Sequence, residues 1–174
     1  MRMHRIVLFL LLLVLSSFKN TDNASRKVMP SGGGHQDASV DFTLQDTGNH
    51  TVTLSQFKGK FVVLVMEANW CRPCLEEIRA TKEMQANLLG QNIVWVFISF
   101  DRDKKSWEEA MKENNLKGIQ LWGKPKSEDL KKTFRFDSLP YYIWVDKDGT
   151  IALEDAPRPS MHSAIKQLRV YLNG

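Results

Sequence analysis

The two cysteines of this 174-residue chain stand two residues apart in the segment Trp70-Cys71-Arg72-Pro73-Cys74. Two thiols at this spacing can close a small disulfide ring if a helix begins between them. A helix N-terminus also stabilises the thiolate of the first cysteine. Pro73 suits the first turn of such a helix, where its missing N–H costs nothing. The segment therefore predicts a redox-active dithiol.

Arg72 places a cation beside Cys71, which favours the thiolate. A shift of two pKa units would stabilise the reduced form by ~0.8 kcal/mol at pH 7, or ~20 mV for a two-electron couple. Known potentials of redox-active protein dithiols span roughly 150 mV. Arg72 alone therefore does not decide between a reductant and an oxidant, and a merely solvating arginine is the alternative interpretation.

The residues around the cysteine pair predict alternating strands and helices. Residues 40–44 and 51–54 alternate apolar and polar positions around a turn and predict a β-hairpin. Residues 61–66 and 93–100 are apolar runs typical of central strands covered on both faces, usually in a parallel sheet. Between them, a helix is expected from about Pro73 to Leu89, with Leu75, Ile78, Ala86 and Leu89 on its apolar face.

The second half of the chain continues the alternation. Ser106 and Glu109 form a capping-box pattern for another helix, and a short helix is expected at residues 127–133. A strand over 139–145, a turn at Asp148-Gly149, a strand over 151–153 and a closing amphipathic helix through Met161 and Leu172 follow. This order predicts an α/β protein, a three-layer α/β/α sandwich with a mixed sheet and an N-terminal hairpin.

The N-terminus predicts export. Arg2 and Arg5 precede an unbroken apolar run over residues 6–15, which is typical of a secretory signal peptide and short for a membrane span. We interpret residues 1–24 as a signal peptide or N-terminal membrane anchor, 25–38 as a flexible tether and 39–174 as the folded domain. No cysteine stands directly after the apolar run to carry a lipid. The formal net charge of +4 gives no support for nucleic-acid binding.

Over residues 40–172 the sequence resembles the thioredoxin superfamily, in particular its exported TlpA/ResA-like branch. The resemblance lies in a hairpin ending in residues 54–60, a strand ending in Ala68 to Cys74, and Leu139-Pro140 leading into residues 143–149. It implies that Cys71 attacks a substrate disulfide and that Cys74 resolves the mixed disulfide, so the pair cycles between dithiol and disulfide. It further implies a cis peptide bond before Pro140, substrate backbone pairing at Leu139, and a surface position for Trp70.

Two residues before the cysteines depart from the family pattern. Val65 stands where many members carry a buried acidic residue that assists the second cysteine, and Glu67 stands where an aromatic residue is common. We hypothesise that Glu67 takes over proton transfer at Cys74, directly or through water. The alternative is that Glu67 points to solvent at the strand end.

The resemblance implies an exported, periplasmic or extracytoplasmic thiol-disulfide oxidoreductase that exchanges electrons with protein disulfides or dithiols, as a reductant supplied by a membrane electron donor. Cytochrome c maturation is one role in this family. A peroxiredoxin-like thiol peroxidase is an alternative, although the residues before Cys71 lack the Pro-x-x-x-Thr-x-x-Cys context. A non-catalytic metal-binding or structural module is another. We expect no cofactor and no metal.

Overall fold

The computed structural model describes residues 40–173, so the expected signal peptide (1–24) and tether (25–38) lie outside the described residues. Within residues 40–173, no helix combines the length and the apolar character needed to cross a membrane. The described part of the chain forms alternating strands and helices, as expected.

A mixed sheet forms the middle layer. Its strands lie in the order β2-β1-β5-β4-β3-β6-β7. β3 pairs in parallel with β4, and β4 with β5, whereas the other pairings are antiparallel. The strands are β1 (Thr43–Gln45), β2 (Thr51–Thr53), β3 (Phe61–Glu67), β4 (Ile93–Ser99), β5 (Ile119–Trp122), β6 (Tyr141–Val145) and β7 (Ile151–Leu153).

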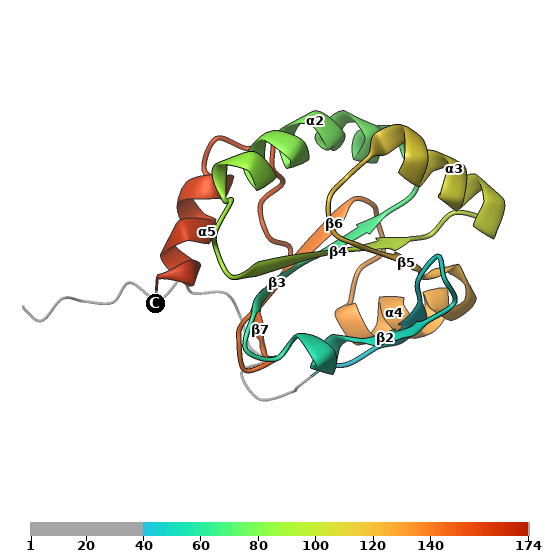
Figure 1. Cartoon of the computed structure of the whole chain (residues 1–174), viewed down its shortest axis with the longest axis horizontal. Helices are drawn as coiled ribbons and strands as arrows, with labels where there is room; N and C mark the ends of the chain where they lie inside the picture. The colour runs from blue at the N-terminus through green and yellow to red at the C-terminus, as the bar shows by residue number, and fades with distance from the viewer. Residues whose placement is uncertain (1–39, 174) are drawn as a thin grey trace, which may run out of the picture. The chain divides into compact units, whose positions relative to one another are not determined.

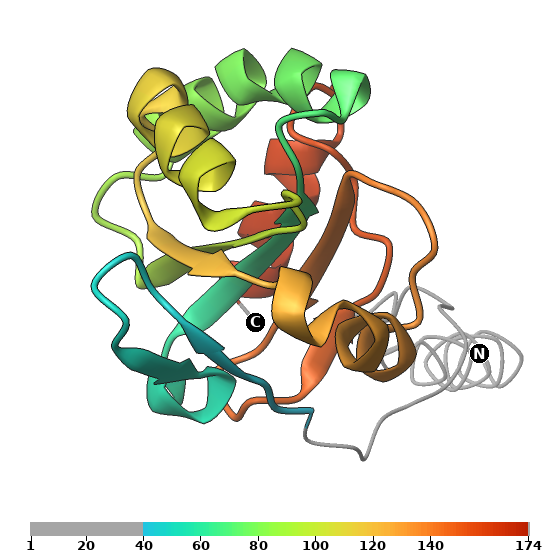
Figure 2. The same cartoon turned by 90° about the vertical axis from the view of Figure 1, so that its right-hand side faces the viewer.

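Helices cover both faces of this sheet. Figures 1 and 2 show α2 and α3 on one side of the strands and α4 on the other. α5 packs on the same side as α2, because its buried residues share a core cluster with the C-terminal half of α2. This arrangement confirms the predicted three-layer sandwich. The helices are α2 (Arg72–Asn87), α3 (Lys104–Asn114), α4 (Ser127–Phe134) and α5 (Ala164–Leu172), with short 3₁₀ turns η1 (Leu54–Phe57) and η2 (Lys124–Lys126).

The burial of both faces of strand β3 explains why residues 61–66 lack polar side chains. Val62, Leu64 and Met66 belong to the core cluster that includes α4, whereas Val63 and Val65 belong to the cluster beneath α2 and α5. Since both faces of the strand are buried, alternation of polar and apolar residues would place polar groups in the core. The continuous apolar run is the result.

Strand β5 was not expected from the sequence. It is four residues long, includes Gln120, and is closely flanked by Gly118 and Gly123, so it offers too little periodicity to identify. It nevertheless joins two parts of the sheet, since it pairs with β4 on one side and with the hairpin strand β1 on the other.

The predicted apolar face of the cysteine-bearing helix is wrong. Leu75 and Leu89 are exposed, and α2 ends at Asn87. The face that packs against the sheet carries two polar side chains that have hydrogen-bond partners outside the helix, so hydrophobic periodicity did not mark it. This buried face consists of Cys74, Glu77, Thr81, Met84 and Leu88.

Two further helix starts differ from expectation. α3 begins at Lys104, and Asp103 caps it by accepting a hydrogen bond from the Ser106 N–H (2.9 Å), so Ser106 is inside the helix. An aspartate at this position satisfies a free N–H of the first turn as well as serine does. Met161 lies before α5, which begins at Ala164, and is exposed.

We predict that Leu64→Ala destabilises the fold by about 2 to 5 kcal/mol, because it leaves a cavity in a fully buried central strand. Chemical denaturation of the oxidised protein measures this. Val170→Ala, on the exposed side of α5, is the control and should change stability by less than about 0.5 kcal/mol. Equal losses in both variants would contradict the assigned core.

Candidate active site

The two cysteines lie at the start of α2, directly after the chain leaves β3. Cys71 is the N-cap residue, and its Sγ accepts a hydrogen bond from the Cys74 N–H (3.3 Å). The Cys71 and Cys74 sulfurs form a disulfide, with the Cα atoms 5.2 Å apart. Once the bond is reduced, the free N–H groups of the first helical turn stabilise a thiolate at Cys71.

Apolar side chains border the disulfide. The cysteines are only 5% and 4% exposed, whereas Trp70 is 59% exposed and its Nε1 donates to the Phe100 carbonyl (3.4 Å). The Leu139–Pro140 peptide bond is cis, as the resemblance implied. Pro140 and Cys74 line the same small hollow. An exposed aromatic ring beside a nearly covered disulfide offers a surface against which an extended chain can pack.

Arg72 points away from the interior. Its guanidinium Nε donates to Glu76 (3.1 Å) one helical turn later, and both side chains are largely exposed. Exposed pairs at this spacing are screened by water and contribute only a few tenths of a kcal/mol. Arg72 therefore brings a cation near Cys71 together with a neutralising anion, which weakens its effect on the thiolate. Pro73, beside it, is exposed in the first turn.

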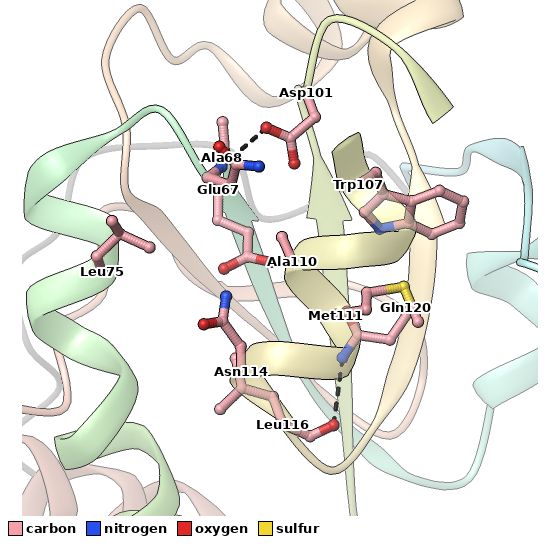
Figure 3. A pocket seen from close by; sticks show the side chains of 11 residues that line it. Glu67, Ala68, Leu75, Asp101, Trp107, Ala110, Met111, Asn114, Leu116 and Gln120 are labelled. Carbon is pink, nitrogen blue, oxygen red and sulfur yellow. Dashed lines mark hydrogen bonds between the residues drawn. The ribbon is translucent and has the colours of Figure 1, made fainter. Parts of the chain in front are cut away.

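Glu67, the last residue of β3, faces the space between α2 and α3. Figure 3 shows its carboxyl directed toward Asn114 and flanked by Leu75 and Ala110. The side chain also lines the second hollow, which contains Cys74, Pro140 and Tyr142. Burial, with a smaller contribution from the negative charge of Asp101, raises the pKa of Glu67 to about 7.

Asp101 is a buried carboxylate that the sequence analysis missed. It follows β4, is 2% exposed, and lines the hollow of Figure 3 with Glu67. Its Oδ1 accepts from the Asn69 N–H (2.9 Å), and its Oδ2 accepts from the Ser99 hydroxyl (2.8 Å). The sequence signal that could have identified Asp101 was its position just beyond an apolar parallel strand. The carboxyl ends of neighbouring parallel strands meet at one edge of the sheet, where functional side chains gather.

A second polar group lies beneath α2. The Glu77 carboxylate accepts from the Ser160 N–H (3.0 Å) and hydroxyl (2.6 Å), and Thr81 hydrogen-bonds Tyr142. Burial is the main cause that raises the pKa of Tyr142, so its hydroxyl stays neutral at ordinary pH. Val65 lines the hollow that also contains Cys74 and Tyr142. The groups beside Cys74 in this hollow that can exchange protons are therefore the Glu67 carboxyl and the neutral Tyr142 hydroxyl.

No group of three or more histidine, cysteine, aspartate or glutamate side chains within residues 40–173 is arranged to hold a metal ion. The fold and this disulfide define the class of the protein, a thioredoxin-fold thiol-disulfide oxidoreductase.

The chain belongs to the AhpC/TSA family, whose model matches residues 36–154. A thiol-disulfide oxidoreductase from Bacteroides vulgatus, solved in solution, is 30% identical with a TM-score of 0.67, covering 84% of this chain and 91% of that one. The exposed lipoprotein thioredoxin of Streptococcus pneumoniae is 28% identical with a TM-score of 0.60, covering 74% and 96% of the two chains.

The thiol-disulfide oxidoreductase ResA of Bacillus thuringiensis subsp. konkukian is 25% identical over 114 residues. That alignment covers 65% of this chain and 64% of ResA. Together with the two solved structures, this similarity confirms the resemblance to the ResA-like branch that the motifs around Cys71 and Pro140 indicated.

We predict that Glu67→Gln removes a pH-dependent penalty on stability. Because folding raises the pKa of Glu67 from 4.5 to about 7, its contribution to stability is lost as pH rises through that interval. The variant should gain stability relative to wild type between pH 4.5 and 7, by at most about 3 kcal/mol. Denaturation of both oxidised proteins across this range measures the difference, and a constant difference would contradict the assignment.

Proposed function

We propose that the protein is an exported enzyme that reduces disulfide bonds in other proteins through Cys71 and Cys74. The observation that carries this proposal is the disulfide at the N-terminus of α2, with Cys71 as the N-cap and Cys74 behind it next to Pro140. A helix N-terminus favours a thiolate, and a thiolate is the species that attacks a disulfide.

The reaction has two exchange steps. The Cys71 thiolate attacks one sulfur of the substrate disulfide, and the other substrate sulfur leaves as a thiolate. Cys74 then loses its proton and attacks the Cys71 sulfur, which restores the disulfide and releases the second substrate thiolate. The exposed Trp70, together with the half-buried Leu139 and the buried cis-Pro140, supports binding of an extended substrate segment beside the disulfide.

Glu67 is proposed as the proton acceptor for Cys74. Both residues line one hollow, and a carboxyl with a pKa of about 7 exchanges protons readily near neutral pH. Many members of the family carry an assisting acidic residue at the position of Val65, which has no carboxyl. Glu67 supplies that group from the end of the same strand.

Export is proposed from the N-terminal sequence and from the pneumococcal relative, which is an exposed lipoprotein. Outside the cytosol, disulfide-containing proteins are available as substrates. The enzyme must then be reduced again after each turnover, and a membrane protein that carries electrons across the bilayer is the proposed donor.

Charges around the cysteines support a reducing role. Strong disulfide oxidants owe their potential to a stabilised thiolate in the reduced form. Here Arg72 is paired with Glu76 at the surface, while Glu67 and Asp101 place acidic groups inside. We therefore predict a midpoint potential nearer to the thioredoxin value of about −270 mV than to the DsbA value of about −120 mV. Equilibration with glutathione or dithiothreitol buffers measures it, and a value near that of DsbA would reverse the proposed direction.

We predict that a Cys74→Ser variant traps substrates as mixed disulfides through Cys71, because the resolving thiol is missing. Expressed as the full chain in its host, it should yield adducts that dithiothreitol releases. The matched control, Cys71→Ser, should trap none and should lose all insulin-disulfide reductase activity. Absence of adducts with Cys74→Ser, together with an inactive wild type, would contradict the enzyme proposal.

A thiol peroxidase remains the second candidate, favoured by the match to the AhpC/TSA family. The reduced wild-type protein would then consume peroxide without a disulfide substrate, in a reaction that needs Cys71. Peroxide consumption slower than the insulin reaction by orders of magnitude would exclude it as the main activity.

A further inference from the structure

Among the residues that the structure describes, Glu67 is the one titratable side chain that lines both of the hollows near the start of α2. One hollow contains Cys74, Pro140 and Tyr142, and the other contains Asp101 and Trp107. Each has room for about one water molecule. The Glu67 side chain therefore borders both the hollow that contains Cys74 and the hollow that contains Asp101.

Asp101 is held firmly in the hollow shown in Figure 3. The Asn69 N–H and the Ser99 hydroxyl each donate to a different carboxylate oxygen, and the Asp101 N–H donates to Ser99 Oγ (3.0 Å). These two donors fix the orientation of the Asp101 carboxylate. Because it is buried, its charge is poorly screened by water and acts on Glu67, which lines the same hollow.

The other side chains around Glu67 are uncharged near neutral pH. Tyr142, from β6, is neutral, and Cys74, from α2, is in the disulfide. α3 and β5 present only uncharged groups to these hollows, namely Trp107, Ala110, Met111, Asn114 and Gln120. Trp107 Nε1 is buried and has no hydrogen-bond partner within residues 40–173, so the wall near Asp101 retains an unused donor. Asp101 is therefore the charged group among these residues that acts on Glu67, in addition to the larger effect of burial.

We propose that Asp101 is a positioning residue that keeps Glu67 basic enough to take the proton from Cys74 during the second exchange step. This inference rests on the proposed function. The Cys74 S–H bond breaks, its proton passes to a Glu67 carboxylate oxygen, and the Cys74 sulfur attacks the Cys71 sulfur as the substrate thiolate leaves. When a donor dithiol later reduces the disulfide, Glu67 returns the proton to the Cys74 thiolate.

The benefit of this arrangement lies in matching proton affinities. A carboxyl at its ordinary pKa of 4.5 is a weak base toward a thiol with a pKa near 8.5, whereas one at about 7 is closer to both Cys74 and the working pH. Burial of Glu67 provides the larger part of the shift, and the Asp101 charge provides a further part. Removing the charge should therefore lower the proton affinity of Glu67 without removing Glu67.

The test is the Asp101→Asn variant, which keeps a carbonyl oxygen for the Asn69 N–H and loses the charge. The ¹³C resonance of the Glu67 carboxyl should titrate at a lower pH than in wild type. The rate of Cys74 resolution, followed from a preformed mixed disulfide, should show the same shift. If the midpoint falls by one unit, the fraction of its own plateau rate reached at pH 6 rises about fivefold.

Two further variants make the result specific. Glu67→Gln should abolish this pH dependence, and adding Asp101→Asn to it should change nothing more, since both act through one carboxyl. Asp129→Asn is the matched control, because it removes the same charge from an exposed position on α4, across the sheet. It should leave the Glu67 titration and the rate profile unchanged.

An unchanged Glu67 midpoint in Asp101→Asn, or an unchanged resolution profile in Glu67→Gln, would overturn the inference. Both results leave the trapping of substrates by Cys74→Ser intact, so they are distinct from failure of the proposed function. If Asp101→Asn does not fold, the wild-type Asp101 carboxyl resonance provides the measurement. It should show an inflection at the Glu67 midpoint near pH 7, and its absence would contradict the coupling.

Discussion

The parallel pairing of β3 with β4 is the constraint on which the candidate site depends. It runs in register from Phe61 opposite Ile93 to Glu67 opposite Ser99. Beyond its end, the Phe100 N–H donates to the Glu67 carbonyl (2.7 Å), and the Asn69 N–H donates to Asp101. These bonds hold the segments that follow β3 and β4 together for two residues past the strand ends. They fix where the backbone turns into α2, and therefore where Cys71 meets the helix N-terminus.

The elements that carry this constraint could be predicted because their signals are local. The apolar runs of β3 and β4, the proline in the first turn of α2 and the Asp148-Gly149 turn each depend on neighbouring residues alone. The spacing of Cys71 and Cys74 and the resemblance around Pro140 were also sufficient to place the disulfide and the cis bond. Strand β5 lacked such a signal, because a four-residue strand beside glycines has almost no periodicity.

The parts of the site that were missed depend on partners distant in sequence. Glu77 and Thr81 are buried because Ser160, 83 residues after Glu77, and Tyr142 provide their hydrogen bonds. On a helical wheel such residues are assigned to the solvent side, which is why Leu75 and Leu89 were placed on the wrong face. Asp101 is similar: its burial is possible because Asn69 and Ser99 donate to it. Polar side chains that bind one another in the core cannot be identified from hydrophobic periodicity.

The position of charges relative to water determines which of them influence the disulfide. Arg72 is adjacent to Cys71 in sequence, but its exposed guanidinium is screened by solvent and paired with Glu76. Glu67 is four residues before Cys71 and Asp101 is thirty after it, but both reach hollows beside the helix start, where the effective dielectric is lower. The residue between two cysteines is thus a weaker guide to their chemistry than the strand ends beneath them. In this protein those strand ends carry the carboxyl groups of Glu67 and Asp101.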